Sequence, residues 1–458
     1  MEIWPRRAAL VLCALVSGCG GGGGSPPLPA SAPSPSASGW RLTIYYTPVM
    51  SYYSGPPQTV TGCLTLQCSN GTATLGTFPS DFVAQVHEEG TGKIGPNQYL
   101  NWSGNTGYWL DTLPRDAQGN ALVPYRSAAA DPSIPFGTTF KIQSCGADTA
   151  TAAPTAASVC ASYTWQMWEV EDRFTVGAVG QHVDLYVGEQ SSATFTSGPN
   201  FIDASGAALT MTSPVPATSI WRPSPADSFQ WILSTALDPS ATASVYDIDG
   251  FNSSSADVAT LHGLGRRAVC YINTGAYENF RPDASSFPGQ VIGNPYAGWP
   301  GENWLDIRRI DLLGPIMQAR FDMCKTKGFD AIEPDNIDGF QNATGFPLNA
   351  DDQVVYNTWL ASMAHERGMS IALKNDDSQV PQLASLYDFA LTEDCWQQGW
   401  CAHDAPLRAA GKAVFTVEYT DVTTPATFTG TYCPQAKAAG FYAILKNRQL
   451  DAWVQTCP

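Results

Sequence analysis

The chain is poor in positive charge and in long apolar runs. Only 24 of its 458 residues are Lys or Arg, against 41 Asp or Glu, so its formal net charge is −17. An acidic surface repels phosphate backbones, which argues against nucleic acid as a partner. Beyond the first 19 residues, no segment is apolar enough to cross a bilayer.

The sequence also lacks the spacings that commonly hold metals and nucleotide cofactors. No CxxC pair or Cys/His cluster of the zinc type occurs. The segment from Asp247 to Gly250 lacks the third oxygen ligand and the distant Glu of a calcium loop. No Gly-rich dinucleotide loop follows the first strand predicted in the C-terminal half. We therefore expect neither a metal nor a cofactor.

The N-terminus has the composition of a targeting segment. Arg6 and Arg7 precede the apolar stretch 8–16, and small residues then lead to Cys19, as in bacterial lipoprotein signals. The Gly/Pro/Ser-rich residues 20–39 predict a flexible tether. We expect a signal peptide over 1–19, a lipid on Cys19, and a membrane-anchored location in the bacterial cell envelope, outside the cytoplasm. A plain secretory peptide and a secreted protein are the alternative.

The cysteine count fits an oxidising location. The chain has twelve cysteines, and setting aside Cys13 and Cys19 leaves ten, an even number. Up to five disulfides are predicted, although spacing alone does not determine their pairing. Nearness in sequence suggests Cys63 with Cys68, Cys145 with Cys160, Cys395 with Cys401 and Cys433 with Cys457, which leaves Cys270 for Cys324.

Residues 221–458 alternate short apolar runs with helix-like periods. This pattern is typical of a parallel sheet with crossover helices, and it predicts a (β/α)8 TIM barrel within an α/β fold. Helices are expected over 316–327 and 352–367, each ended by a glycine, Gly328 and Gly368. A doubly wound open sheet is the competing architecture. The eight predicted strands are 230–234, 245–249, 268–275, 331–336, 370–375, 389–394, 413–419 and 440–447.

Acidic or polar residues follow where these apolar runs stop. The carboxyl ends of barrel strands converge on one face, so these side chains are expected to meet there. Hydrolysis of a glycosidic bond requires an acid and a second carboxylate on opposite sides of the bond. The candidates are Asp247 and Asp249, Tyr271, Asp335, Lys374, Glu393, Glu418 and Tyr419.

These strand ends belong to motifs that occur in a definite order along the chain. The motifs are Gln230-Trp231-Ile232-Leu233, Tyr246-Asp247-Ile248-Asp249-Gly250, Cys270-Tyr271-Ile272, Trp304-Leu305-Asp306-Ile307-Arg308, the run from Gly328 to Asn336, and Leu373-Lys374-Asn375. Over residues 225–458 they resemble glycoside hydrolase family 114, the endo-α-1,4-polygalactosaminidases. The resemblance implies cleavage inside a galactosamine polymer, with Asp335 and Glu393 as the catalytic carboxyls.

We predict Asp335 as nucleophile or base and Glu393 as acid. The acid needs a drier wall, which Trp396 would supply, whereas donors such as Lys374 would hold Asp335 ionised. Glu333 is expected to turn away from Asp335 as a buried ion-pair partner. The alternative for Asp335 is a helix N-cap.

The remaining strand-end residues are expected to contact the sugar, or else to pack in the barrel wall. Acidic side chains in the cleft would attract the ammonium groups of galactosamine, and aromatic rings would support flat sugar faces. The long loop 276–300 is the expected cleft wall. The expected contacts are Asp247, Asp249, Tyr271, Lys374, Trp396, Glu418 and Tyr419, with Tyr277, Trp299, Trp304 and Trp400 as further platforms, Trp304 being equally well explained as core.

Residues 40–220 are rich in β-forming runs and predict a smaller, mainly-β domain. The runs 131–138, 171–174 and 182–186 resemble the three-aspartate family, which forms a double-psi β-barrel and includes lytic transglycosylase A. The resemblance implies Asp172 as a catalytic acid supported by Asp131 and Asp184. The sequence departs from the family pattern after Asp172, where Arg173-Phe174-Thr175 stands in place of a glycine-rich turn. The alternative is that these Asp side chains cap turns.

The sequence therefore predicts a monomeric, lipid-anchored, extracytoplasmic glycoside hydrolase that cleaves a galactosamine-containing polysaccharide. One alternative is a non-catalytic carbohydrate-binding lipoprotein. The other is a peptidoglycan-remodelling enzyme that acts on cell-wall glycan through Asp172.

Overall fold

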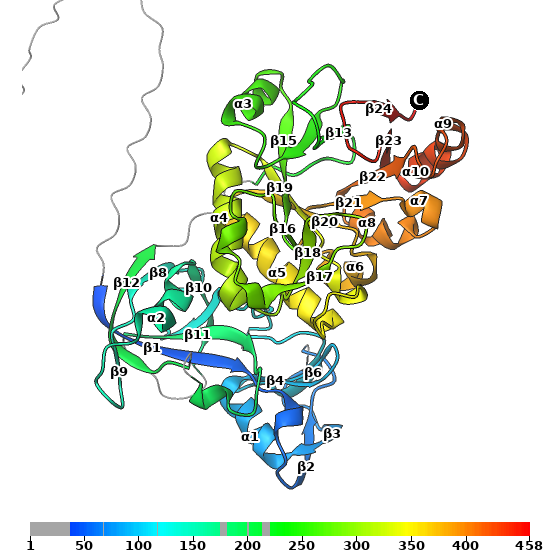
Figure 1. The fold of residues 1–458 in the computed structure, drawn as a ribbon. Coiled ribbons are helices and arrows are strands. Elements are labelled where there is room, and N and C mark those ends of the chain that lie inside the picture. The colour runs from blue at the N-terminus through cyan, green and yellow to red at the C-terminus, as the bar shows by residue number, and fades with distance from the viewer. Residues whose placement is uncertain (1–36, 67, 117, 175–180, 199–200, 213–219) are drawn as a thin grey trace, which may run out of the picture. The chain divides into compact units, whose positions relative to one another are not determined.

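A computed structural model describes residues 37–458, except 67, 117, 175–180, 199–200 and 213–219 (Figure 1). The predicted signal peptide, Cys19 and nearly all of the predicted tether lie outside the described residues. The described residues belong to one compact unit. Within the described part of the chain, we find no helix with both the length and the apolar character needed to span a bilayer.

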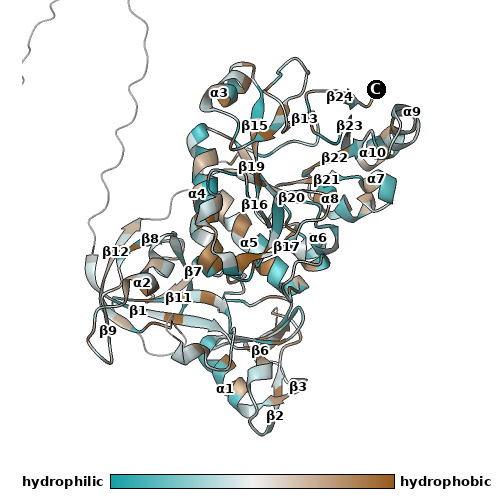
Figure 2. Cartoon of the chain, viewed as in Figure 1, coloured by the Kyte–Doolittle hydropathy of each residue, from teal (hydrophilic) through white to brown (hydrophobic). Residues whose placement is uncertain are grey.

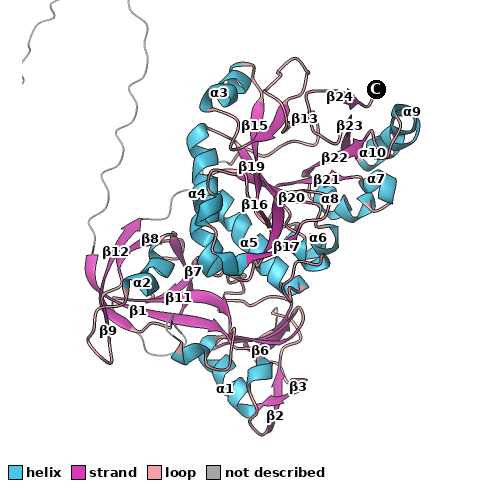
Figure 3. Ribbon diagram, viewed as in Figure 1, coloured by secondary structure: helices cyan, strands magenta, loops and turns pink. Residues whose placement is uncertain are grey.

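Residues 37–212, here called the N-terminal module, consist mainly of strands (Figure 3). Six of them hydrogen-bond in a closed ring whose interior holds apolar residues such as Leu42, Phe140 and Trp168. In ring order the strands are β1 (Ala37–Thr47), β11 (His182–Glu189), β7 (Ser127–Ala130), β10 (Trp168–Arg173), β8 (Thr139–Ser144) and β12 (Ala204–Thr212), which pairs back with β1.

Smaller elements attach to this ring. They are the edge strand β9 (Ala147–Asp148), the helices α1 (Ser80–Glu89) and α2 (Ala157–Thr164), the pair β2 (Pro57–Gly62) and β3 (Ala73–Pro79), and a sheet of β4 (Thr91–Gly95), β5 (Gln98–Ser103) and β6 (Gly107–Asp111).

The C-terminal half contains a nine-stranded sheet whose strands follow one another in chain order. Eight of them are parallel and confirm the predicted strands, with β14 and β22 ending where they were expected. They are β13 (Phe229–Ile232), β14 (Val245–Asp249), β15 (Arg267–Asn273), β19 (Ala331–Asp335), β20 (Ser370–Lys374), β21 (Phe389–Glu393), β22 (Ala413–Tyr419) and β23 (Tyr442–Lys446), followed by the antiparallel β24 (Val454–Thr456).

The sheet curls into a nearly closed barrel. Lys446 Nζ on β23 donates to Gln230 Oε1 on β13 at 2.9 Å, so side chains join the first and last parallel strands, although these two strands share no backbone ladder. Residues 233–244, which connect β13 to β14, form no helix. The structure is thus a mixed α/β fold in which the predicted alternation of strand and helix is incomplete at its first unit.

Two long helices, α4 (Ile310–Lys327) and α5 (Ala350–Glu366), cover the strands in the middle of the sheet (Figure 1). Gly328 ends α4 in a left-handed conformation, as predicted, and an Asn349/Asp352 capping box begins α5. The remaining helices of this half are shorter: α3 (Ser255–Gly263), α6 (Val380–Leu383), α7 (Cys395–Gln398), α8 (Ala405–Ala409), α9 (Pro425–Thr427) and α10 (Cys433–Ala439).

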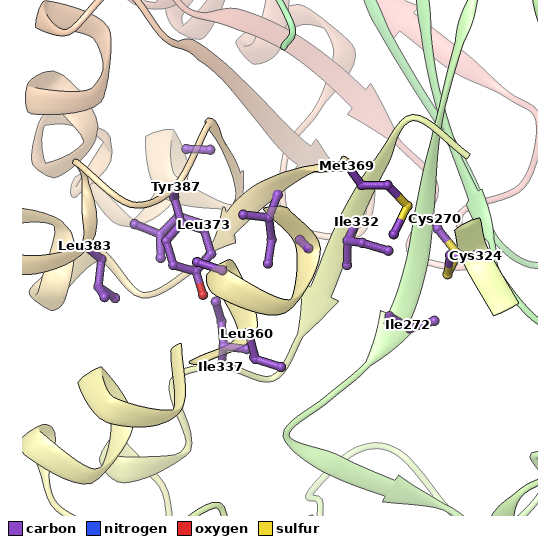
Figure 4. Packing of buried hydrophobic residues seen from close by; sticks show 14 of the residues in the cluster. Cys270, Ile272, Cys324, Ile332, Ile337, Leu360, Met369, Leu373, Leu383 and Tyr387 are labelled. Carbon is purple, nitrogen blue, oxygen red and sulfur yellow. A yellow bond between two sulfur atoms is a disulfide. The ribbon is translucent and has the colours of Figure 1, made fainter. Parts of the chain in front are cut away.

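Strand alternation divides the apolar residues of the barrel into two sets. Val245, Ala331 and Phe415 belong to an inner cluster, whereas their sequence neighbours Ile332 and Val414 pack outward against the helices. Figure 4 shows part of this outer layer, and Figure 2 shows hydrophobic residues on both the strands and the covering helices. Because strand side chains alternate between two faces, the same rule decides which polar strand-end residues face the barrel interior.

All five predicted disulfides are present. Cys270 on β15 is bonded to Cys324 on α4, which joins a strand to its covering helix (Figure 4). The other bonds are Cys63–Cys68, Cys145–Cys160, Cys395–Cys401 and Cys433–Cys457.

Candidate active site

A pocket of about 820 Å³ opens at the carboxyl ends of the parallel strands. One side is built by an inserted sheet of β16 (Ala276–Glu278), β18 (Glu302–Leu305) and β17 (Ile292–Pro295), which is the long loop expected as a cleft wall. The lining contains eight acidic residues against three basic ones. The acidic residues are Asp249, Glu278, Glu302, Asp335, Asp338, Asp377, Glu393 and Asp394, and the basic ones are Arg281, Lys374 and Arg448.

Lys374 lies at the centre of the carboxylates on the pocket floor. Its Nζ is 2.8 Å from Asp335 Oδ1, 3.1 Å from Glu393 Oε2 and 2.9 Å from Glu333 Oε1. The ammonium also lies 4.8 Å from the centre of the Trp231 ring. One cation thus links Asp335 and Glu393, whose strands are separated by β20.

Each of these two carboxylates has a second set of donors. The Tyr271 hydroxyl donates to Asp335 Oδ2 at 3.0 Å. The Tyr419 hydroxyl donates to Glu393 Oε1, and Asn375 Nδ2 donates to Glu393 Oε2 at 2.8 Å. Tyr271 and Tyr419 therefore orient the two carboxyl groups from opposite sides of the site.

The backbone after three adjacent strands adopts the left-handed conformation. Asn336, Asn375 and Asp394 follow β19, β20 and β21 with φ of 60°, 54° and 53°. Asn and Asp tolerate this conformation better than most residues. Gly275 allows β15 to approach closely, because a Cβ there would lie 1.6 Å from the Asn336 carbonyl oxygen. These turns direct the chain away from the pocket immediately after Asp335, Lys374 and Glu393.

The electrostatics of Glu393 differ from the prediction. Burial alone would raise its pKa, but the Lys374 ammonium, the Tyr419 hydroxyl and the Asn375 amide hold the pKa of Glu393 below its ordinary value. The expected dry wall at Trp396 is absent, since Trp396 does not line the pocket. In the free protein Glu393 is therefore an ionised carboxylate, and the higher pKa expected for it was wrong.

Below the floor lies a second acid pair that excludes substrate. Asp247 and Glu333 are both fully buried, and each carboxyl group shifts the pKa of the other. Burial and the neighbouring Glu333 charge raise the pKa of Asp247 well above its ordinary range, so the Asp247 carboxyl is neutral. Asp247 is thus no sugar contact, which corrects the prediction.

Glu333 does not turn away from Asp335, as the sequence suggested. Residues two apart on a strand share a face, and both Glu333 and Asp335 point inward to bind Lys374. Glu333 does form the expected buried ion pair.

Several predicted sugar contacts have structural partners instead. Glu418 is buried on the outer face of β22 and accepts the backbone N–H groups of Trp396 and Gln397 at the start of α7. The Trp396 indole donates to Thr416 and packs beside Phe441. Tyr277 and Trp304 lie outside the pocket lining, and Trp304 is buried core.

Other predicted residues do line the pocket. Tyr271, Lys374, Tyr419, Trp299 and Trp400 belong to its lining.

Asp249 also lines the pocket, but Arg281 binds its carboxylate at 2.8 Å and two backbone N–H groups donate to it. Asp249 is therefore less available to a sugar than the prediction supposed.

Sequence reasoning missed the acids contributed by loops. Glu302 accepts a hydrogen bond from Asn273 Nδ2 at 3.3 Å. Burial raises the pKa of Glu302 to about 8, and the charges of Glu278 and Asp335 add to the rise. Burial raises the pKa of Asp338 to about 6. Phe280 and Tyr296 add aromatic rings to the lining. None of these residues ends a barrel strand, so the strand-end rule could not find them.

The second predicted site is only partly assembled. Asp172 and Asp184 line one pocket in the N-terminal module. Asp131 does not line that pocket, and its Oδ1 accepts the Ser133 N–H at 2.8 Å.

Comparison with known proteins identifies the C-terminal half. The sequence model of glycoside-hydrolase family GH114 matches residues 210–458, more than half of the chain. The chain belongs to glycoside hydrolase family GH114. Among curated proteins, none matches this GH114 chain.

Three solved structures are similar to this GH114 protein. The crystal structure of Aspergillus fumigatus Ega3 in complex with galactosamine is 36% identical, covers 52% of this chain and 98% of that chain, and has a TM-score of 0.50. The glycoside hydrolase domain of PelA from Pseudomonas aeruginosa is 14% identical, covers 50% and 98%, and has a TM-score of 0.41. A membrane-bound lytic murein transglycosylase from Agrobacterium tumefaciens is 13% identical, covers 38% and 74%, and has a TM-score of 0.25.

As a GH114 member the protein is a glycoside hydrolase. Its pocket holds two carboxylates, Asp335 and Glu393, on one cation. Lys374 Nζ lies 2.8 Å from Asp335 Oδ1 and 3.1 Å from Glu393 Oε2, so these two oxygens are no more than about 6 Å apart. Carboxyl pairs at ~5–5.5 Å act by double displacement, whereas inverting pairs need ~6.5–9.5 Å to admit a water.

Proposed function

We propose that the protein is a retaining hydrolase that cleaves inside α-1,4-linked galactosamine polysaccharide, with Asp335 and Glu393 as the catalytic pair. The observation that carries the proposal is the Lys374 ammonium, which holds these two carboxylates side by side on the floor of an acidic cleft.

In the reaction, one carboxyl protonates the leaving glycosidic oxygen and the other attacks the anomeric carbon. The first then deprotonates the water that releases the sugar from the covalent intermediate. We assign attack to Asp335, which Tyr271 and Lys374 orient, and proton transfer to Glu393. Lys374 would stay with both groups as charge moves from one to the other.

The lining of the cleft supports an amino-sugar polymer as substrate. Eight acidic residues against three basic ones create a negative potential that attracts ammonium groups. Phe280 and Trp299, which are 59% and 48% exposed, offer flat faces at the opening for further sugar rings. The similar Ega3 structure contains galactosamine, in agreement with this substrate class.

The function is tested by incubating the purified protein with partially deacetylated α-1,4-galactosamine polymer. We expect oligosaccharides of several lengths by mass spectrometry and an α-anomer as the first product by NMR. Release of monosaccharide alone would contradict internal cleavage. A first product of β configuration would contradict retention.

The pH profile tests the two roles. If Glu393 donates the proton, kcat/KM falls as pH rises above its lowered pKa, because only the protonated acid is active. Tyr419→Phe removes a donor to the Glu393 carboxylate, so its pKa rises and the alkaline limb of the kcat/KM profile moves to higher pH.

Tyr271→Phe is the matched control, because it removes the corresponding donor to Asp335 and leaves those of Glu393 in place. Its alkaline limb should stay where it is in the wild type. If the alkaline limb moved in Tyr271→Phe and stayed in place in Tyr419→Phe, Asp335 would be the acid and Glu393 the nucleophile.

We further propose a lipid anchor at Cys19 and a location outside the cytoplasm. The support is the small residues before Cys19, the tether that follows and the five disulfides. Loss of membrane association in Cys19→Ser would check this anchor.

We also infer the fold type and extent of the two domains. The eight parallel strands of 221–458 form a (β/α)8 barrel without its first helix. The closed six-strand ring of residues 40–220 is a double-psi barrel. An experimental structure whose strand connections differ from those of a double-psi barrel would reject the second assignment.

A further inference from the structure

Arg448 lies at the rim of the active-site pocket, in the segment that follows β23. Its guanidinium binds two carboxylates: Nη1 lies 2.9 Å from Asp394 Oδ2, and Nη2 lies 3.0 Å from Asp421 Oδ1. Nε also donates to Asp421 Oδ2 at 3.0 Å, so this second pair is bidentate. Asp394 directly follows β21, and Asp421 follows β22. Arg448 therefore joins the loops at the carboxyl ends of three adjacent strands.

The same guanidinium lies over an aromatic ring of the site. Arg448 Cζ is 3.8 Å from the centre of the Tyr419 ring, a distance at which a cation and a ring attract each other electrostatically. Tyr419 is buried on β22, and its hydroxyl donates to Glu393 Oε1. A cation, a ring, a hydroxyl and a carboxylate thus follow one another toward the pocket floor.

The Arg448 charge makes the Tyr419 hydroxyl a stronger donor. Burial and the Glu393 charge raise the pKa of Tyr419 well above its ordinary value, and the positive charges of Lys374 and Arg448 oppose this rise. A hydroxyl that releases its proton more readily donates a stronger hydrogen bond to a carboxylate, and bonds in such a chain polarise one another. The strength of the bond to Glu393 therefore depends on the cation at the ring.

Tyr271, the counterpart that donates to Asp335, has different surroundings. Burial and the Asp335 charge raise the pKa of Tyr271 well above its ordinary value, and the neighbouring acids Glu278 and Glu333 add to the rise. The arginine therefore distinguishes the two tyrosines, and it favours the donor to Glu393 over the donor to Asp335.

Other groups also act on Glu393 and stay in place when Arg448 is replaced. Lys374 Nζ lies 3.1 Å from Glu393 Oε2 and lowers the pKa of Glu393 by its charge. Loss of Arg448 should therefore reverse only part of the lowering. Among the described residues, the charged and titratable groups that face Glu393 are Lys374 and Asp335 on the neighbouring strands, Tyr419 on β22, Asp394 after its own strand, and Asp338 and Tyr296 from the loops.

We propose that Arg448 is a positioning residue for Glu393, which acts through Tyr419 by strengthening the hydrogen bond that this tyrosine donates to the carboxylate. A carboxyl group that ionises more easily is a stronger acid toward the leaving glycosidic oxygen. This inference rests on the proposed function only where it gives Glu393 the role of the acid. The contacts of Arg448 do not depend on that role.

The test measures the ionisation of Glu393 directly, without substrate. The full protein is isotopically labelled at its glutamate carboxyl carbons and titrated by NMR, and Glu393→Gln identifies the signal. Arg448→Gln removes the cation and keeps a donor for Asp394, whereas Arg448→Met keeps the apolar stem beside the ring. In both variants the Glu393 pKa should rise by roughly 0.5, about half of the ~1 unit expected from Tyr419→Phe, which removes a hydrogen bond to a charged group. Arg448→Lys keeps the charge and should restore most of the wild-type value.

A double variant separates the route through Tyr419 from a general effect of the Arg448 charge. The hydroxyl is absent in Tyr419→Phe, so adding Arg448→Gln should shift the Glu393 pKa no further. A purely structural role of Arg448 would give two shifts that add.

Arg267→Gln is the matched control. Arg267 also binds a carboxylate, that of Asp330 at 2.7 Å, and lies 5.6 Å from the centre of the Trp221 ring, but it begins β15 at the opposite end of the barrel strands. Its replacement should leave the Glu393 pKa unchanged.

The proposal is overturned if Arg448→Gln and Arg448→Met leave the Glu393 pKa where it is, or if their full shift persists in Tyr419→Phe. A pKa that rises as expected supports it, and the alkaline limb of kcat/KM on polymer should then move to higher pH by the same amount. If the pKa rises and the limb stays, Glu393 is not the acid, and the proposed function fails while the action of Arg448 on Glu393 stands. A wild type that cleaves no polymer likewise rejects the proposed function alone.

Discussion

Asp335→Asn and Glu393→Gln should each lower kcat on galactosamine polymer by at least ~10³-fold. Loss of the acid removes general catalysis worth ~10²–10⁴-fold, and loss of the nucleophile removes the covalent route itself. Both changes keep the size of the side chain, so the hydrogen bonds from Tyr271 and Tyr419 retain an oxygen to accept them. The measurement is the initial rate of reducing-end release.

Asp249→Asn is a suitable control for this pair. Asp249 is an acid of the same pocket, but Arg281 and backbone N–H groups hold it away from Lys374. It should retain most of the wild-type kcat. A non-catalytic carbohydrate-binding protein is excluded if polymer is cleaved by the wild type and binding survives in both inactive variants. Full activity in Asp335→Asn would overturn the catalytic pair.

Lys374→Met should be the most destabilising single substitution in the pocket, at about 3–5 kcal/mol. Although burial disfavours a charged amine, the carboxylates of Asp335, Glu333 and Glu393 raise the pKa of Lys374 well above its ordinary value. Its removal leaves the fully buried Glu333 and the partly buried Asp335 and Glu393 without a cation. Denaturant unfolding at neutral pH measures the loss, which should shrink as pH falls, because protonation of the carboxyl groups removes their repulsion.

Lys446→Met provides the contrast. Lys446 is also buried, but its Nζ contacts only the amide oxygen of Gln230 and the carbonyl of Asp451. Burial lowers its pKa to about 8, so the protein loses stability by keeping it charged. Its replacement should cost far less than that of Lys374. Adding Glu333→Gln to Lys374→Met should restore part of the stability, and no recovery would show that the acid network is not the cause.

Local pattern predicted the strands and suggested the disulfide pairs that the structure contains. An apolar run that stops at a polar cluster is visible in a short window, and the eight strands were found by that rule. Nearness in sequence gave four cysteine pairs, and elimination gave the fifth. The prediction did not use one further local pattern, the residue that follows each of three strand ends. Asn or Asp directly follows Asp335, Lys374 and Glu393, and each turns the chain in the left-handed conformation.

The choice among strand-end candidates could not be made from a list of residues. Glu418 and Tyr419 are adjacent, so alternation allows only one of them to face inward, and Tyr419 does. Asp247 faces inward but lies one layer below Asp249, where Glu333 rather than sugar meets it. Depth inside a barrel depends on the register between strands, which distant segments set.

Sequence alone indicated the eight strands, approximately where each one stops, and cysteine partners that the structure shows to be bonded, since apolar runs and nearness in sequence are local features of the chain. The protonation states of the site carboxyls and the pocket of the N-terminal module follow only from the tertiary structure. Lys374, Tyr419 and Asn375 surround Glu393 only after three strands align, and the field they create at close range reverses the pKa shift that burial alone would produce.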